Sequence, residues 1–252
     1  MTLYDLSVLA LEITRGIISD KIYNMWFPTS WLVAYWKADE SSWNMADYIW
    51  WFTLTNNNTA TFTTWKINNW ASLNGTTQYF SSTSDLWLWW SSQNFSFSMW
   101  IKPSSTIIAQ QIFINHTDGN NHNDIQIDWF SWNVRFIRTR LWIASDVASG
   151  TQTFIWGTWY HLVVTYDGTT LKWYVNNWTA VTVASSWNWS SWWADGIAIW
   201  ALRWWWTYFW GMIDEIGAWN RALSSTEVSD LYNWGSWISY SGITGAFLQF
   251  FL

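Results

Sequence analysis

The chain has 252 residues, a formal net charge of −6 and no cysteine, and only 11% of its residues are charged. These values exclude disulfides and thiolate metal centres, and the lack of a basic patch argues against nucleic acid as a partner. The length suits one undivided all-β domain with a sizeable core. No membrane span is predicted, because the longest apolar end, residues 246–252, is too short to cross a bilayer.

The first segment, residues 1–29, is predicted to be an N-terminal helical extension. Apolar residues recur there at alternating spacings of three and four, which makes one stripe of Leu3, Leu6, Ala10, Ile13 and Ile17. We prefer a helix packed on the domain or on a neighbouring subunit, and a short oligomerising coil is the alternative. A signal peptide is not predicted, because a basic n-region is missing and Asp5 and Glu12 bracket the apolar stretch.

The second segment, residues 30–235, is predicted to be one domain of short strands. Turn residues recur about every 8–12 positions, which favours a sandwich or a barrel. Residues 118–121 are predicted to be a turn and residues 144–153 a loop. The predicted strands cover residues 32–39, 61–64, 72–81, 95–102, 107–115, 124–130, 134–139, 160–166, 171–176, 180–184, 197–202 and 212–219.

A short helix is predicted after the last strand. Ser224 and Glu227 have the spacing of a capping box, in which each side chain bonds the other residue's backbone N–H group. Residues 236–252 then form a Gly/Ser-type linker and an apolar C-terminal tail. One interpretation is that this tail docks on another chain; the simpler interpretation is a frayed end.

Four stretches carry a family resemblance. They are residues 209–233 (FWGMIDEIGAWNRALSSTEVSDLYN), residues 157–177 (GTWYHLVVTYDGTTLKWYVNN), residues 73–80 with 95–103, and residues 32–39. Taken in their order along the chain, from residue 32 to residue 233, they resemble the blocks of the laminin-G-like, concanavalin-A-like lectin/glucanase jelly rolls. The resemblance implies an all-β jelly roll of two antiparallel sheets with one short C-terminal helix.

Tryptophan is unusually abundant, with 31 Trp against 12 Gly. Several Trp residues occupy positions where the resembled family has glycine, in doublets such as Trp50-Trp51 and at the expected tip of a hairpin, Asn177-Trp178, where a two-residue turn needs φ > 0. We therefore predict that most are glycines whose UGA codons were translated as Trp. The alternative is a genuinely Trp-rich protein, and UGG codons at these positions would establish it. Four Trp match family aromatics: Trp36, Trp100, Trp159 and Trp219.

Catalysis is not predicted. A retaining glycosidase needs two carboxyl groups about 5 Å apart on one face, whereas the adjacent Asp214 and Glu215 should point to opposite faces of their strand. Three histidines, His116, His122 and His161, are the only ones in the chain. We expect His161 to be packed or hydrogen-bonded within the sheet and the other two to be solvated.

Calcium is the candidate metal. Asp118, Asn123 and Asp124 supply hard oxygen ligands near one turn, and Asn123-Asp124 falls where the related pentraxins place a calcium-binding pair. The loop after residues 197–200 lacks the further carboxylates of those proteins. An Asx-rich turn without metal is the preferred interpretation.

The predicted function is a non-catalytic recognition or adhesion module of a surface or virion protein, with carbohydrate or protein as ligand. The alternative is a structural assembly subunit of the tail-fibre or capsid-decoration type, and a glycoside hydrolase is a third interpretation. Sugar binding by stacking on Trp is discounted if most Trp are glycines. The expected location is extracellular, on a cell surface or on a virion, and a homo-oligomer is compatible with the N-terminal stripe.

Overall fold

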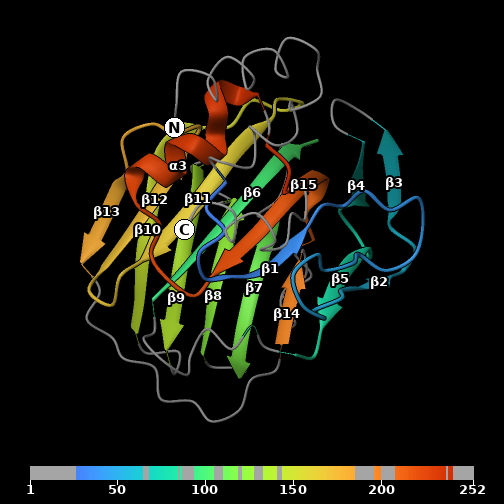
Figure 1. The fold of residues 1–252 in the computed structure, drawn as a ribbon, viewed down its shortest axis with the longest axis horizontal. Coiled ribbons are helices and arrows are strands. Elements are labelled where there is room, and N and C mark those ends of the chain that lie inside the picture. Colours follow the sequence, from blue (N-terminus) through green and yellow to red (C-terminus); the bar gives the residue numbers. More distant parts are fainter. Residues whose placement is uncertain are drawn as a thin grey trace, which may run out of the picture.

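The computed structural model in Figure 1 describes residues 27–64, 68–84, 86, 94–104, 110–118, 121–127, 133–140, 144–184, 196–199, 208–236 and 238–240. The predicted N-terminal helix and the apolar C-terminal tail lie outside these residues. Within the described part of the chain, no helix is long and apolar enough to cross a membrane.

Strands make up most of the described chain, and one short helix follows the last of them. The strands are β1 Leu32–Trp36, β2 Thr55–Asn57, β3 Thr61–Thr64, β4 Asn69–Asn74, β5 Tyr79–Ser82, β6 Phe95–Pro103, β7 Gln110–Asp118, β8 Asn121–Ile127, β9 Asn133–Arg140, β10 Ala144–Thr153, β11 Tyr160–Tyr166, β12 Thr170–Val175, β13 Val181–Ala184, β14 Gly196–Ile199 and β15 Trp210–Trp219. The helices are α3 Ser225–Tyr232 and the 3₁₀ turn η1 Asn233–Gly235.

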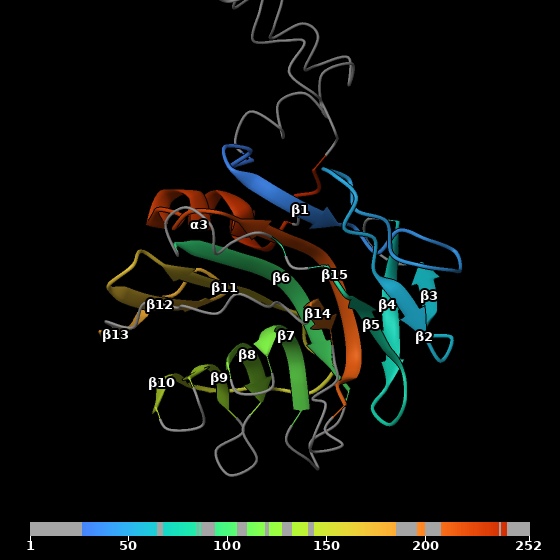
Figure 2. The ribbon, with the colours of Figure 1, turned by 90° about the horizontal axis from the view of Figure 1, so that it is seen from below.

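Two antiparallel sheets form the predicted sandwich. The first has the order β13-β12-β11-β6-β15-β4-β3, with β1 also paired to β15, and the second has the order β10-β9-β8-β7-β14-β5-β2. The view in Figure 2 shows them as two layers, with β1 and α3 on the outer side of the first sheet. The predicted jelly roll is therefore confirmed.

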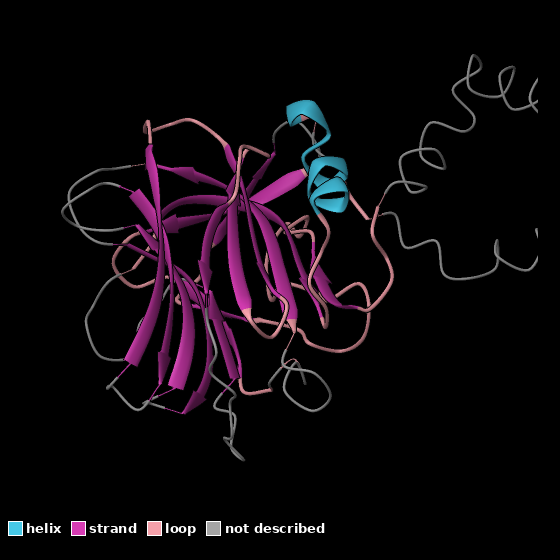
Figure 3. Cartoon of the chain, turned by 90° about the vertical axis from the view of Figure 1, so that its left-hand side faces the viewer, coloured by secondary structure: helices cyan, strands magenta, loops and turns pink. Residues whose placement is uncertain are grey.

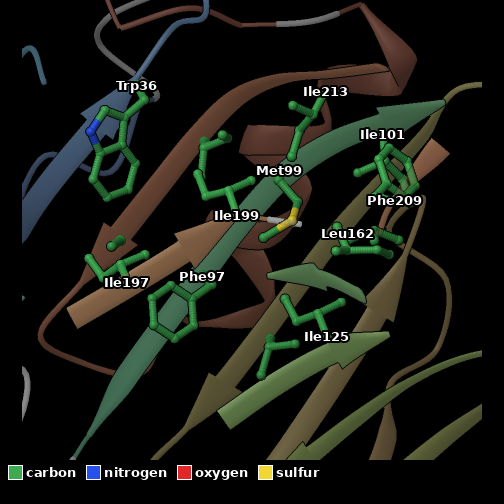
Figure 4. Packing of buried hydrophobic residues seen from close by; sticks show 14 of the residues in the cluster. Trp36, Phe97, Met99, Ile101, Ile125, Leu162, Ile197, Ile199, Phe209 and Ile213 are labelled. Carbon is green, nitrogen blue, oxygen red and sulfur yellow. The ribbon is translucent and has the colours of Figure 1, made fainter. Parts of the chain in front are cut away.

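The main core lies between the two layers, and alternation along the strands explains it. On β6, Phe97, Met99 and Ile101 face this core, whereas Ser96 and Ser98 between them make polar hydrogen bonds. Figure 4 shows these apolar side chains meeting Ile125, Ile197 and Ile199 from the second sheet. The sandwich is held by burial of apolar surface from both sheets.

A second apolar cluster lies on the outer face of the first sheet, and we call it the outer cluster. It joins β1, the end of β15, α3 and both ends of the described chain. Figure 3 shows α3, in cyan, outside the strands. The cluster consists of Phe27, Leu32, Tyr35, Val163, Tyr174, Trp219, Leu223, Val228, Leu231, Ile238 and Tyr240.

Helix α3 begins as the sequence predicts. The Ser224 hydroxyl accepts a hydrogen bond from the backbone N–H of Glu227 at 3.2 Å, and the Glu227 carboxylate accepts one from the backbone N–H of Ser224 at 2.9 Å. Arg221 adds a two-pronged contact to the same carboxylate at 2.8 and 2.5 Å. The helix ends at Asn233, whose left-handed backbone stops it.

The predicted loop at residues 144–153 is wrong, because this segment forms strand β10. Its residues pair with β9 from Ala144 opposite Arg140 to Thr153 opposite Asn133. The sequence ASDVASGTQT has few strand-forming side chains, so pairing to the backbone of β9 decides its conformation.

The predicted tip of the β12 hairpin is also displaced by one residue. Asn176 and Asn177 have φ of 49° and 58°, and the N–H of Trp178 closes the turn on the carbonyl oxygen of Val175 at 3.0 Å. Asn tolerates the left-handed region, so the two central positions are filled by Asn176 and Asn177, and Trp178 is the last residue of the turn, without a positive φ. Of the described Trp residues, Trp31 and Trp43 have positive φ, at 60° and 79°.

Candidate functional site

The loop between β1 and β2 exposes four large aromatic side chains. Trp43, Tyr48, Trp50 and Trp51 are 84%, 43%, 60% and 64% exposed. All four lie within residues 43–52, which we call the aromatic loop and which follow β1 in blue in Figure 1. Side chains of this kind are commonly buried, and a group of them on one surface loop marks a site of interaction.

Asp47 fixes the backbone of the aromatic loop. Its Oδ1 accepts hydrogen bonds from the N–H groups of Tyr35 at 2.9 Å and Ile49 at 3.0 Å, and its Oδ2 accepts from Trp50 at 3.0 Å and Phe52 at 3.2 Å. The bond to Tyr35 ties the loop to β1, and the others form an Asx-type turn. The rings therefore project from a backbone with a defined shape.

The exposed rings present faces in different directions. The rings of Trp50 and Trp51 meet at 76° with their centres 5.7 Å apart. The Nζ of Lys37 lies 4.4 Å from the centre of the Tyr48 ring, a cation–π contact. Such faces suit flat apolar surfaces of a ligand, including the C–H face of a sugar ring.

Four carboxyl groups lie next to the aromatic loop, at the place where β15 stops pairing with β4 and begins pairing with β1. β15 pairs with β4 through Ile213 and with β1 from Ile216 onward. Between them the ladder to β6 shifts register, and Glu215 adopts a φ of 49°. This is a β-bulge. We call Asp39, Glu40, Asp214 and Glu215 the carboxylate junction.

The predicted opposite orientation of Asp214 and Glu215 is wrong, and the bulge is the reason. Ile213 and Ile216 both face the main core, so the two residues between them lie on the outer side. Glu215 accepts a hydrogen bond from the hydroxyl of Tyr35, a member of the outer cluster. One extra residue in β15 thus places two adjacent carboxyl groups on one face.

The pair is closed off from solvent. Asp214 is 1% exposed and Glu215 is 3% exposed. The Tyr35 hydroxyl that donates to Glu215 also accepts from the N–H of Tyr240 at 3.3 Å. Burial, reinforced by the charge of Asp39, raises the pKa of Glu215 to about 8. Burial and the Glu215 charge also raise the pKa of Asp214 well above its usual value, so this pair holds protons near neutral pH.

Asp39 and Glu40 join β1 to β4 at the rim of the junction. The Asp39 carboxylate accepts from the side-chain amide of Asn68 at 3.1 Å and from the backbone N–H of Asn69 at 3.2 Å. Glu40 Oε1 accepts from the N–H of Ala46 at 2.8 Å. Burial raises the pKa of Glu40. Both residues are half-buried beside the aromatic loop, and the second carboxylate oxygen of Glu40 is buried.

The three histidines lie on strands of both sheets. As predicted, His161 is buried in its strand, with a ring nitrogen 2.8 Å from the Ser98 hydroxyl, and burial lowers its pKa to about 3. It is therefore neutral at physiological pH. His116 and His122 pair with each other across the β7–β8 ladder.

The candidate calcium ligands are spread along the backbone of the β7–β8 hairpin. Asp118 lies opposite Asn121 at the hairpin end, whereas Asp124 is buried in β8 opposite Ile114, four positions further along β7. That separation corresponds to about 13 Å along the strand. Asn123 pairs with Asn115 at the backbone level. Among the described residues, no group of three acidic, His or Cys side chains is arranged to hold a metal ion, and the calcium hypothesis stays a prediction.

Sequence reasoning missed the aromatic loop and the role of Asp47. The sequence interpretation takes the Trp50-Trp51 doublet as a pair of misread glycine codons and so assigns its side chains no role; the structure does not test this hypothesis. The available signal was the acidic residue just before a run of aromatics, because Asp commonly closes a turn on the N–H groups two and three residues ahead.

The family model of the concanavalin A-like lectin/glucanases superfamily matches residues 74–229 of the chain. No curated protein matches the chain. Among solved structures, domain 4 of AbnA, an extracellular GH43 arabinanase from Geobacillus stearothermophilus in complex with arabinotriose, aligns with a TM-score of 0.67 at 22% identity. The alignment covers 80% of this chain and 98% of that domain.

Two larger proteins contain a similar domain. The receptor-binding domain of botulinum neurotoxin C/D mosaic serotype aligns with a TM-score of 0.65 at 13% identity, over 81% of this chain and 51% of the other. Trypanosoma rangeli sialidase aligns with a TM-score of 0.63 at 13% identity, over 85% of this chain and 34% of the other. The chain thus spans about half or a third of these proteins, and the likeness concerns the fold.

Proposed function

Because the chain belongs to the concanavalin A-like lectin/glucanase superfamily, we propose that it is a non-catalytic recognition module that binds carbohydrate through the aromatic loop. The proposal takes the chain with Trp at positions 50 and 51, the alternative to misread glycine codons. The observation that carries it is the set of exposed rings of Tyr48, Trp50 and Trp51 on a backbone fixed by Asp47. Rigid aromatic side chains contribute contact area with little loss of conformational entropy. The expected setting is extracellular or at a surface.

The comparisons support a sugar as the ligand class. One domain of the same fold was solved with arabinotriose. Cell entry of botulinum neurotoxin type C, which has a domain of similar fold, depends on interaction with two ganglioside molecules. The alignment with the arabinotriose-bound domain covers nearly all of that domain. A single module of this size is therefore sufficient to hold a glycan in one relative.

Burial of the acidic pair supports a non-catalytic role. A glycosidase needs its two carboxyl groups on either side of the scissile bond, so a substrate must reach them. Asp214 and Glu215 share a face, but both are nearly inaccessible behind Tyr35. A reducing-sugar assay on arabinans and glucans should accordingly detect no release, and release that disappears in Glu215→Gln would contradict this part of the proposal.

The binding surface is tested with ring-removing variants. We expect the chain to bind members of a glycan array, with arabinotriose as first probe, and Tyr48→Ala, Trp50→Ala and Trp51→Ala each to weaken binding about tenfold, as for loss of a stacked ring. Tyr48 is informative whichever way the Trp codons are read. Trp178→Ala is the control, because Trp178 is 63% exposed on a different loop. Equal affinity in all four variants would show that the loop is not the binding surface.

An assembly subunit is the alternative, and one observation favours it. Phe27 and Tyr240, near the two ends of the described chain, have ring centres 5.5 Å apart in the outer cluster. The two ends of the described chain therefore lie side by side, as suits a domain carried on a larger assembly. Light scattering that shows a stable oligomer, together with no binding on the glycan array, would favour this alternative.

A further inference from the structure

The surroundings of the aromatic loop are acidic. Asp39, Glu40 and Asp47 border the loop or lie in it. The raised pKa values of Asp214 and Glu215 keep that buried pair protonated near neutral pH, so the negative charge at this corner comes from the first three residues. Within the described chain, Lys37 is the cation at this corner, and its Nζ rests on the ring of Tyr48. The molecule as a whole has a net charge of −6. An anionic ligand would therefore meet repulsion both locally and at a distance.

The loop also offers few backbone N–H groups to a ligand. Proteins often bind anions with runs of backbone N–H groups, but here those groups point inward. The N–H of Tyr48 donates to the carbonyl oxygen of Tyr35 at 2.9 Å, and those of Ile49, Trp50 and Phe52 donate to the Asp47 carboxylate. The exposed side chains of the loop present aromatic faces, and the polar groups on these rings, the indole N–H groups and the Tyr48 hydroxyl, carry no charge.

We propose that the aromatic loop selects neutral glycans and discriminates against glycans that carry carboxylate or sulfate groups. The inference rests on the proposed carbohydrate-binding function and adds the ligand class. A neutral sugar presents C–H faces to Tyr48, Trp50 and Trp51, and a hydroxyl group donates to the half-buried carboxylate of Asp39. An acidic sugar gains the same stacking but places its charge among like charges.

Matched glycan pairs test this selection. The probes are lactose against 3′-sialyllactose and a neutral oligosaccharide against its uronic-acid-capped form, measured by calorimetry at 50 mM and 500 mM NaCl. We expect the acidic member of each pair to bind about tenfold more weakly at low salt, and the difference to shrink at high salt because salt screens the repulsion. Binding of the neutral member should not change with salt.

Charge-removing variants locate the effect. The double variant Asp39→Asn/Glu40→Gln should reduce the discrimination against the acidic member about fivefold at 50 mM NaCl. Asp230→Asn, which removes one charge on α3, should leave the ratio unchanged. Circular dichroism and melting curves establish that each variant is folded, and if the double variant is unfolded, Glu40→Gln alone is measured.

The outcomes separate the two proposals. Tighter binding of the sialylated or uronic member, or a ratio that does not respond to salt, overturns the selectivity while leaving carbohydrate binding intact. Binding of neither member, on the pairs and on the wider array, overturns the proposed function and this inference with it.

Discussion

At the scale of single residues, two tryptophans occupy backbone conformations that suit glycine. Trp31 and Trp43 have φ of 60° and 79°, and their side chains are 68% and 84% exposed. A bulky residue in the left-handed region costs about 1–2 kcal/mol, and the exposed rings recover little of it. The prediction that such positions are misread glycine codons is not tested by this geometry, but its energetic consequence can be measured.

Replacing these residues by glycine should therefore stabilise the protein. We expect Trp31→Gly and Trp43→Gly each to raise the free energy of unfolding by about 0.5–1 kcal/mol, after allowing for the greater entropy of unfolded glycine. Urea unfolding measures the change. Trp178→Gly is the control, because Trp178 is exposed but has an ordinary φ, so it should give no gain. A loss of stability in both test variants would contradict the argument.

Glu215 predicts a dependence of stability on pH. Its pKa is raised by burial from 4.5 to about 8 in the folded protein. The folded state therefore keeps a proton that the unfolded state releases above pH 4.5. The stabilisation is fully present below pH 4.5, declines as pH rises towards 8 and is then lost. The raised pKa of Asp214 acts in the same direction.

Urea unfolding at pH 5 and pH 8.5 measures this loss, which we expect to be on the order of 3–5 kcal/mol. Glu215→Gln keeps the shape and an acceptor for Tyr35 but cannot ionise, so its stability should change much less over this range. Asp167→Asn, at the exposed turn after β11, serves as control. Equal pH profiles for the native chain and Glu215→Gln would show that Glu215 is not the titrating group.

At the scale of elements, side-chain patterns predicted most strands but not the details of their pairing. β11 Tyr160–Tyr166 and β3 Thr61–Thr64 have the predicted bounds, because their branched and aromatic residues favour strands in any context. β10 was missed because its pairing with β9 is a property of the sheet. The bulge at Glu215 was missed for a similar reason, since it arises where the pairing of β15 with β4 ends and its pairing with β1 begins.

Helix α3 was predictable because its signal is local, and its cap can be tested in isolation. Ser224→Ala removes the hydroxyl that accepts from the N–H of Glu227. The expected cost is about 1 kcal/mol of unfolding free energy, since one N–H group of the first turn loses its partner. Ser225→Ala, at the exposed first helical residue, should change stability by less than about 0.5 kcal/mol. A larger effect at Ser225 than at Ser224 would contradict the assignment of the cap.

At the scale of the whole molecule, the fold followed from ordered blocks of sequence, whereas the candidate site did not. The site depends on contacts between residues far apart in the chain. Tyr35 and Glu215 are separated by 180 residues and meet through a hydrogen bond. The aromatic loop takes its shape from four hydrogen bonds to one carboxylate, which no periodic pattern reveals. Local sequence signals specify strands and helix caps, but contacts between residues far apart in the chain form only once the sheets are assembled.

The last prediction concerns the first and last residues that a stably folded domain requires. The sequence places the domain at residues 30–235, but the outer cluster includes Phe27 before this range and Ile238 and Tyr240 after it. In addition, the carbonyl oxygen of Pro28 accepts the indole N–H of the buried Trp219 at 2.5 Å. A fragment of residues 30–235 would therefore expose apolar surface and leave that indole N–H without its acceptor.

We expect a fragment of residues 27–240 to keep the melting temperature of the full chain, because both described clusters remain complete. The fragment of residues 30–235 should lose at least about 3 kcal/mol, since each buried Phe, Ile or Tyr contributes about 1.5–3 kcal/mol, and its melting temperature should fall by several degrees. Calorimetry of the three chains decides between them. Equal melting of both fragments would mean that the outer cluster is dispensable and that the sandwich core alone sustains the fold.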